Sequence, residues 1–260
     1  MDVVCFVPPQ LVGHLHVVVG EEHRLFIASD WDSLGELIRT EPVDIVVVDP
    51  RDGVIIKTAE VQLLLQQFPS LPLVIYTTLS PLVTQALVTL ASAGLQRVVL
   101  RGFDDDVRRF RTLLERLPEY ELSDQLLALL REPLNEVPVA MRRVISRCVR
   151  SPHEFQDVDD LARATGFTRR TFDRWMEMVG VSSKSLVKIS RAVRAYHLMR
   201  DPGYRLADVA RKVGYQETRL FARHVRQVTG LVPSALRRQL EPDEFIARLG
   251  ERLRSNDVEV

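Results

Sequence analysis

Residues 205–237 carry the sequence RLADVARKVGYQETRLFARHVRQVTGLVPSALR, and this stretch decides the fold of the C-terminal half. Its first part has apolar residues spaced by three and four, which predicts an amphipathic helix. The inward face of that helix is Leu206, Val209, Ala210 and Val213. Gly214 follows, ends the helix and permits a sharp turn. A second helical pattern begins soon afterwards, so the stretch predicts a helix-turn-helix.

The second predicted helix has two unlike faces. Its inward face is Phe221, Val225 and Val228. Its outward face is Arg219, Ala222, Arg223 and Arg226. A basic face of this kind fits a DNA major groove, where arginine binds guanine edges or phosphates. The alternative is an ordinary amphipathic helix with a solvated basic face.

The same pattern occurs once earlier in the chain. Positions that match the first helix at an offset of 48 residues are Val158, Leu161, Ala162, Thr165 and the pair Gly166-Phe167. Positions that match the second helix at an offset of 49 are Phe172, Met176 and Val179. The outward face of this copy is Arg170, Asp173, Arg174 and Glu177. Two copies of one supersecondary unit predict one architecture used twice.

A further helix is predicted between the two copies, over residues 184–200. Ser182 or Ser183 suits its N-cap, and Asp201-Pro202-Gly203 ends it. At about 1.5 Å per residue, such a helix is roughly 25 Å long. Successive major grooves on one side of B-DNA are about 34 Å apart. The predicted helix could therefore hold two DNA-reading helices at nearly the spacing of adjacent grooves.

Residues 155–238 resemble the DNA-binding domain of AraC/XylS-type transcription regulators. The resemblance covers roughly a third of the chain, and the most specific segments are DVARKVGY, FARHVRQVTG and the ending Pro233-Ser234…Arg237. Two departures concern packing: Val232 stands where a helix-capping threonine is usual, and Met176, beside Trp175, stands where phenylalanine is usual.

This resemblance implies that the second helix of each copy enters the major groove of double-stranded DNA. The DNA-binding positions it implies are Arg169, Arg170, Asp173, Arg174, Gln216, Thr218, Arg219, Arg223 and Arg226. Which of them contact bases and which contact phosphates is left open at this point.

The N-terminal half alternates predicted strands and helices at short spacing, which predicts an α/β domain with a parallel sheet. Strands are predicted at 3–7, 24–29, 44–49, 73–78 and 96–100, and helices at 32–40, 58–68, 81–93 and 104–117. Residues 14–19 fit either a helix or a strand. The pattern resembles the flavodoxin-like receiver domain of two-component response regulators.

Receiver chemistry is only partly present in the sequence. By the resemblance, Asp49 occupies the phosphoacceptor position, and Thr77 or Thr78 would supply the hydroxyl. No carboxylate follows the first strand to hold Mg²⁺, and Arg101-Gly102 stands where Lys-Pro is usual. We therefore expect a degenerate receiver in which Asp49 forms a turn at the strand end, with phosphorylation of Asp49 as the alternative.

Four segments are expected along the chain. They are a receiver-like domain at 1–117, a helical linker at 118–150, the double helix-turn-helix domain at 151–240, and a C-terminal helix and tail at 241–260. The linker carries an apolar stripe of Leu122, Leu126, Leu129 and Leu130. This stripe fits either packing within one chain or a dimer seam, and a homodimer could form through the linker or through the receiver-like domain.

The zero net charge of the chain hides a strong asymmetry. Residues 1–140 hold 11 basic and 20 acidic side chains, a net of −9; residues 141–240 hold 21 and 9, a net of +12. Residues 241–260 hold 3 and 6, a net of −3. The positive block coincides with the repeated unit, which favours a polyanionic partner and salt-sensitive binding.

Composition and localisation signals favour a cytoplasmic protein with no membrane partner. No apolar run approaches the ~20 residues that span a bilayer, and Met1-Asp2 lacks a signal peptide's basic start. Cys5 and Cys148 are far apart, so reduced thiols are expected rather than a redox pair. His14, His16 and His23 suit a surface role better than a metal site, so no cofactor is predicted.

The sequence thus favours a sequence-specific DNA-binding transcription regulator with two recognition helices and a regulatory or dimerising N-terminal domain. The alternatives are a response regulator controlled by phosphorylation of Asp49 and a protein-interaction module that docks acidic proteins through its helical repeat. An enzyme is not expected, because the sequence shows no paired carboxylates, nucleophile with base, or metal cluster at usable spacing.

Overall fold

The computed structural model describes residues 1–53, 55–118, 120–239 and 241–254, and the chain divides into two compact units. The first comprises Met1–Glu119 with Asp201–Tyr204, and the second comprises Tyr120–Arg200 with Arg205–Val260. The tail expected at 255–260 lies outside the described residues. Among the described helices, none combines the length and the apolar character needed to cross a bilayer.

The first unit contains a five-stranded, all-parallel sheet in the order β2-β1-β3-β6-β7. Its strands are β1 (Asp2–Phe6), β2 (Arg24–Ile27), β3 (Ile45–Val48), β6 (Leu73–Thr77) and β7 (Arg97–Leu100). Counting only these five strands, the order is 2-1-3-4-5, the flavodoxin-like arrangement. The predicted receiver-like fold is therefore confirmed.

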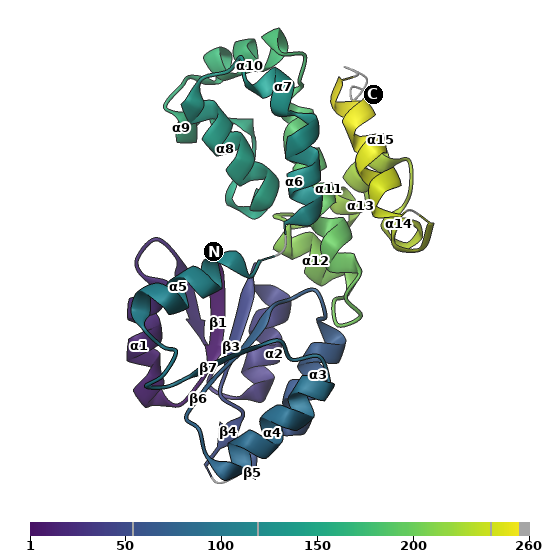
Figure 1. The fold of residues 1–260 in the computed structure, drawn as a ribbon. Helices are drawn as coiled ribbons and strands as arrows, with labels where there is room; N and C mark the ends of the chain where they lie inside the picture. Colours follow the sequence, from purple (N-terminus) through teal and green to yellow (C-terminus); the bar gives the residue numbers. More distant parts are fainter. Residues whose placement is uncertain (54, 119, 240, 255–260) are drawn as a thin grey trace. The chain divides into compact units, whose positions relative to one another are not determined.

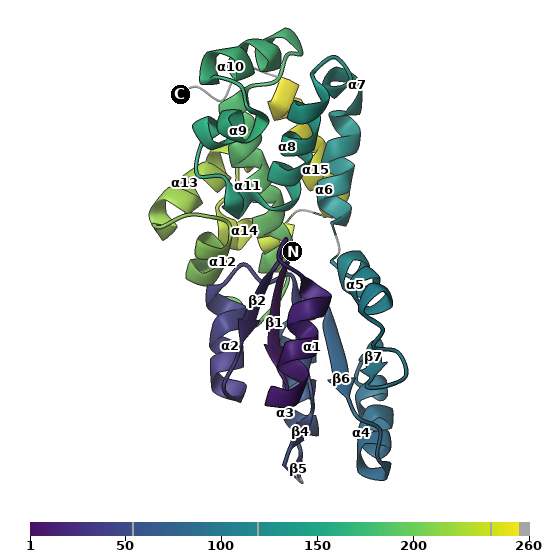
Figure 2. The same ribbon diagram turned by 90° about the vertical axis from the view of Figure 1, so that its left-hand side faces the viewer.

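Five helices cover this sheet on both faces (Figures 1 and 2). They are α1 (Pro9–Val19), α2 (Trp31–Thr40), α3 (Thr58–Gln67), α4 (Pro81–Ser92) and α5 (Val107–Arg116). Helices α1 and α5 pack together on one face, and α2, α3 and α4 lie on the other. Residues 14–19, which fit a helix or a strand, belong to α1.

The core of this unit lies between the sheet and helices α1 and α5. Because the sheet is covered on both faces, its strands are continuous apolar runs, and all four residues of β3 are buried. Leu11, Leu15 and Phe110 pack onto this face with at most 1% of their surface exposed. Each such side chain contributes about 1.5–3 kcal/mol by leaving water.

One element of this unit was not predicted from sequence. Strands β4 (Arg51–Asp52) and β5 (Ile55–Ile56) pair as an antiparallel two-stranded sheet directly after β3. With two residues each, they are too short for an alternating pattern to show. Gly53 supplies the turn, with φ of 61°.

The second unit is helical throughout its described part. Its elements are α6 (Glu121–Leu129), α7 (Arg131–Leu134), α8 (Val139–Arg150), η1 (Pro152–Glu154), α9 (Val158–Thr165), α10 (Arg169–Met178), α11 (Ser183–Met199), α12 (Leu206–Lys212), α13 (Thr218–Thr229), α14 (Pro233–Gln239) and α15 (Pro242–Arg254). Helix α11 is the centre of the unit and contacts α6, α8, α9, α12, α13, α14 and α15. The expected all-α architecture is thus confirmed.

The predicted linker is part of this helical unit. Helix α6 packs against α8, α11 and α15, and its Leu122, Leu126 and Leu130 are at most 6% exposed. Leu129 is 36% exposed and lies against Gly250 of α15. Of the two interpretations of the leucine stripe, burial therefore supports packing within one chain.

Candidate nucleic-acid interface

The second helix-turn-helix consists of α12 and α13 joined at Gly214. This glycine has a φ of 90°, a left-handed conformation that side chains disfavour. On α13, Phe221, Val225 and Val228 are at most 2% exposed, as their spacing predicts. The prediction for one inward residue of α12 is wrong: Leu206 is 37% exposed, although Val158, at the equivalent first position of α9, is 4% exposed.

The outward face of α13 presents three guanidinium groups, those of Arg219, Arg223 and Arg226. All three residues are exposed, and among the described residues none of their side chains makes a hydrogen bond or an ion pair. Gln216 is exposed beside them, and Thr218 is half-buried at the start of the helix. A row of guanidinium groups without acidic partners is suited to bind phosphates and guanine edges, because each guanidinium can donate two parallel hydrogen bonds.

The first helix-turn-helix consists of α9 and α10, with Gly166 at a φ of 78° between them. Thr168 caps α10 by accepting a hydrogen bond from the backbone N–H of Thr171. Arg170 and Arg174 are exposed on its outer face, and among the described residues neither has an ionic partner. This copy therefore also offers two free guanidinium groups.

Arg169 and Asp173 of α10 differ from the other predicted site residues because they bind each other. The Arg169 Nε donates to Asp173 Oδ2 over 2.6 Å, and its Nη1 lies 3.3 Å from Asp159 Oδ1 on α9. The contact with Asp159 links α9 to α10, whereas the pair with Asp173 lies within α10. Sequence spacing placed Asp173 on the outward face but gave no sign of this partner.

Arg191 of α11 is a functional candidate that sequence reasoning missed. Its side chain is 7% exposed, and Nη2 donates to the backbone oxygens of Phe155 (2.8 Å) and Gln156 (3.0 Å). Its guanidinium also lies 4.8 Å from the ring centroid of Tyr215. One side chain therefore joins the entry of the first helix-turn-helix to the turn of the second.

His224 of α13 lies in the same cluster. Its Nδ1 is 3.1 Å from the Tyr215 hydroxyl. Burial, with the nearby positive charges of Lys188, Arg223 and Arg191, lowers the pKa of His224 to about 4. The imidazole is therefore neutral at physiological pH and adds no charge to the basic surface.

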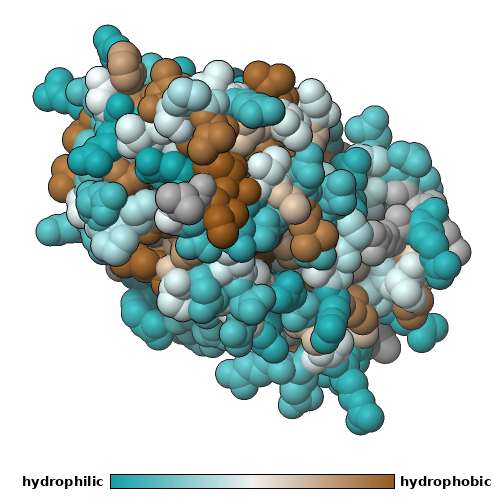
Figure 3. Space-filling model, turned by 90° about the horizontal axis from the view of Figure 1, so that it is seen from below, coloured by the Kyte–Doolittle hydropathy of each residue, from teal (hydrophilic) through white to brown (hydrophobic). Residues whose placement is uncertain are grey.

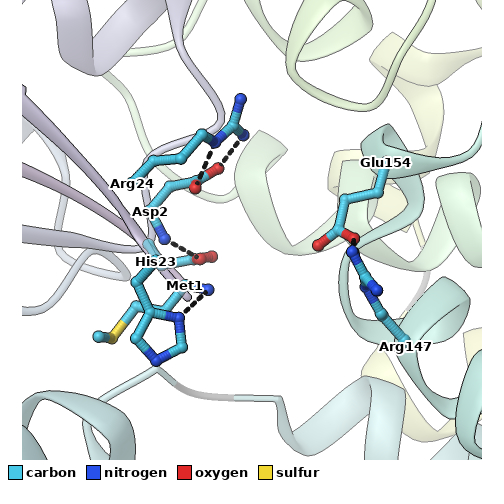
Figure 4. Close-up of polar contacts among 7 residues, drawn as sticks. Met1, Asp2, His23, Arg24, Arg147 and Glu154 are labelled. Carbon is cyan, nitrogen blue, oxygen red and sulfur yellow. Dashed lines mark hydrogen bonds and ion pairs between the residues drawn. The ribbon is translucent and has the colours of Figure 1, made fainter. Parts of the chain in front are cut away.

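Entry into the first helix-turn-helix is held by an ion pair between α8 and η1. The Arg147 guanidinium donates to the Glu154 carboxylate, as Figure 4 shows, and it also lies 5.7 Å from the Phe155 ring centroid. The same figure shows the first unit's edge, where Arg24 of β2 pairs with Asp2 of β1 and the N-terminal amine contacts His23. These contacts hold neighbouring elements together within each unit.

The receiver-like unit carries Asp49 at the position expected for an acceptor. Asp49 is 1% exposed, and it accepts hydrogen bonds from Thr77 Oγ1 (2.9 Å) and from the backbone N–H of Arg51 (3.0 Å). The Arg51 guanidinium adds an ion pair, with Nη2 2.6 Å from Asp49 Oδ2. Thr77, rather than Thr78, is thus the partner hydroxyl.

The Arg51 guanidinium supplies the positive charge that neutralises Asp49. Within the described part of the chain, no three His, Cys, Asp or Glu side chains come close enough to hold a metal ion together. His14 is engaged elsewhere, with Nε2 2.7 Å from the backbone oxygen of Asp105.

Both cysteines are free and fully buried, Cys5 in the first unit and Cys148 in the second. Burial raises the pKa of each thiol to about 12. Thiols of this kind are unreactive, which agrees with the expectation of reduced cysteines.

Comparison with known proteins identifies the C-terminal region. Residues 161–239 match a family model described as a helix-turn-helix domain. Residues 161–239 are therefore similar to a helix-turn-helix domain, in agreement with the helix-turn-helix geometry of α9–α10 and α12–α13. A comparison with curated proteins found no match.

The solved structures that resemble parts of this chain include NtrX from Brucella abortus and full-length FixJ from B. japonicum. NtrX from Brucella abortus is 18% identical with a TM-score of 0.39, over 64% of this chain and 40% of that one. Full-length FixJ from B. japonicum is 13% identical with a TM-score of 0.39, over 68% of this chain and 87% of that one. The chain thus spans well under half the length of the NtrX chain.

Proposed function

We propose that this protein is a sequence-specific transcription regulator in which α10 and α13 read successive major grooves of one DNA site. The observation that carries the proposal is the outward face of α13, where Arg219, Arg223 and Arg226 are exposed and make no ion pair with any residue that the structure describes. Helix α10 supports it with Arg170 and Arg174 in equivalent positions.

The two helices would not contribute equally. Helix α13 presents three free guanidinium groups, whereas α10 presents two, together with the exposed carboxylate of Glu177. We therefore assign the larger contribution to DNA-binding affinity to α13. Arg169 and Asp173 act indirectly, since Asp173 orients Arg169, and Arg169 joins α10 to Asp159 of α9.

One chain with two unlike recognition helices should prefer an asymmetric site of about two helical turns. The first test is selection of bound sequences from a random duplex pool by the full-length chain at near-physiological salt. Two unlike half-sites about one turn apart are expected. Recovery of a single half-site would contradict the reading of two grooves, and recovery of no enriched sequence would contradict specific recognition.

The second test separates base contacts from phosphate contacts. Arg223→Ala should weaken binding to the selected site by about 1–3 kcal/mol, and random DNA by less. Arg211→Ala is the matched control, because Arg211 is exposed on α12 outside the outward face of α13. Equal losses on specific and random DNA would assign Arg223 to phosphate contact alone.

The structure gives phosphorylation control little support. A small phosphodonor would have to reach a carboxylate that is 1% exposed and already bound by Arg51 and Thr77. We assign the receiver-like unit a regulatory or dimerising role that does not depend on modification of Asp49.

Homodimerisation stays a prediction, and the receiver-like unit is the better place for it because the leucine stripe of α6 is covered. Exposed hydrophobic side chains on this unit include Ile55, Leu82 and Val88. Hydrophobic groups, in brown, gather on the face seen in Figure 3. Sedimentation of the full-length chain tests the prediction, and a monomer at high micromolar concentration would contradict it.

A further inference from the structure

Basic side chains are concentrated in one segment of the otherwise acidic first unit. Residues 1–119 contain ten Lys and Arg and 16 Asp and Glu, and six of the ten basic side chains fall between Arg97 and Arg116. This segment comprises β7, the following loop and α5, which lie along one edge of the unit in Figure 2.

Four of these arginines surround a pocket of about 520 Å³ between β7 and α5. Its lining residues are Arg97, Arg108, Arg109, Thr112, Leu113, Arg116 and Leu117. The α5 residues Arg109, Thr112 and Arg116 recur at spacings of three and four, so one helix face supplies most of the wall. Arg97 comes from the start of β7 and closes the opposite side.

Within the described residues, none of the four guanidinium groups has a carboxylate partner. Arg97 donates only to the backbone oxygen of Gln96. Three acidic side chains near or on α5 have other partners: Asp105 accepts from Tyr76 and Gly102, Asp106 caps α5, and Glu115 lies 3.7 Å from His23. Four like charges around one hollow repel one another, so an anion that enters the pocket would relieve this repulsion.

We propose that this pocket binds a small anion that carries at least two phosphate or carboxylate groups. Guanidinium groups bind both kinds of group through paired hydrogen bonds. The volume lies within the range of small-molecule sites. Leu113 and Leu117 give the ligand an apolar surface beside the charged wall.

A small ligand fits this pocket better than DNA does. A long polyanion is repelled by the net negative charge of residues 1–119, whereas a small anion senses mainly the four adjacent guanidinium groups. The proposal does not rest on the proposed DNA-binding function, because α10 and α13 belong to the other unit.

Isothermal titration of the full-length chain tests the proposal with pyrophosphate, citrate and adenosine diphosphate as probes, at constant ionic strength. We expect at least one probe to bind with a Kd below about 1 mM. Pyrophosphate against citrate distinguishes phosphate from carboxylate ligands. The ratio of the Kd values of adenosine diphosphate and pyrophosphate measures how much the contact of the nucleoside with Leu113 and Leu117 adds to binding.

The variant Arg109→Gln/Arg116→Gln should weaken that binding by about tenfold or more. Arg109→Lys/Arg116→Lys keeps the charge but loses the paired donors, so an intermediate loss is expected. The matched control is Arg39→Gln, which removes one charge from α2 and should change the Kd by less than about twofold. A circular dichroism spectrum identical to that of the parent chain shows that each variant is folded.

Three results would overturn the proposal. Two concern the small probes: the absence of binding for all three at about 5 mM, or binding that the double glutamine variant leaves unchanged. The other is binding of heparin or duplex DNA that depends on Arg109 and Arg116 when no small probe binds, which would assign the surface to a macromolecule.

Discussion

Replacement of Arg191 by alanine should destabilise the helical unit. In the folded chain this side chain is 7% exposed, donates to the backbone oxygens of Phe155 and Gln156, and stacks over Tyr215. The alanine variant leaves two backbone oxygens without this donor, one of them in a buried hydrogen bond, and removes the cation–π contact.

The magnitude follows from these contacts. Each lost hydrogen bond costs about 1 kcal/mol, and the cation–π contact contributes about 1 kcal/mol. Removal of a buried charge offsets part of this loss of stability, because the folded state no longer bears the desolvation cost of that charge. A net loss of about 2–3 kcal/mol is expected, equivalent to a fall in Tm of roughly 5–10 °C for a unit of this size.

The assay uses the two tryptophans, which belong to different units. Trp31 lies in the first unit and Trp175 in the second. In a Trp31→Phe background, urea-induced changes in fluorescence report on the helical unit alone. Phenylalanine should be tolerated at position 31, since the Trp31 Nε1 is buried without a hydrogen-bond partner.

The control is Arg211→Ala in the same background, which should change the free energy of unfolding by less than about 0.5 kcal/mol. A loss below about 0.5 kcal/mol for Arg191→Ala would refute the reasoning. It would show that the backbone oxygens find water and that the arginine is not needed to join the two copies.

Three further predictions concern titration and reactivity. Burial and neighbouring cations lower the pKa of His224 to about 4, below the unfolded value of about 6.5. Its contribution to the free energy of unfolding is therefore complete above pH 6.5 and is lost as the pH falls toward 4. Urea unfolding between these pH values should show this dependence of stability on pH, and the same dependence in His224→Asn would contradict the prediction. Cys5 and Cys148 should react with a thiol reagent only after denaturation, since burial raises the pKa of each to about 12; rapid labelling of the native chain would show otherwise. Incubation with acetyl phosphate and Mg²⁺ should leave the intact mass of the protein unchanged, because the Asp49 carboxylate is already paired with the Arg51 guanidinium. A gain in mass of one phosphoryl group that is absent in Asp49→Asn would support Asp49 as a phosphoacceptor.

The sequence was a good guide to the elements because its periodic patterns are long. All five strands of the sheet and the helices of both repeats lie within a few residues of their predicted positions. The β4–β5 hairpin and α7 were missed, since elements of two to four residues leave no period to detect. Residues 14–19 remained ambiguous in sequence because a mostly apolar run fits either a buried helix or a strand.

The candidate site was less predictable, since it depends on partners that are distant in sequence. Outward positions on α13 could be located from helical phase, and Arg219 and Arg223 are indeed exposed. The contact of Arg169 with Asp159 and Asp173, by contrast, requires the angle between two helices. The burial of Arg191 could not be predicted from the sequence, because sequence pattern does not distinguish a buried arginine from a solvated one. Its acceptors are two backbone oxygens, which only the folded chain brings into reach.

If α10 and α13 read successive grooves as proposed, the burial of α11 has a consequence for the evolution of the DNA sites. Thirteen of its 17 residues are buried, so the helix has no free side on which an inserted residue could be absorbed. Each added residue would lengthen α11 by about 1.5 Å and rotate one recognition helix by about 100° relative to the other. One added base pair shifts a half-site by only about 3.4 Å and rotates it by about 35°. An added residue in α11 and an added base pair differ in both translation and rotation, so one cannot compensate for the other. The length of α11 and the spacing of the half-sites should therefore be inherited unchanged while the base sequences of the half-sites diverge.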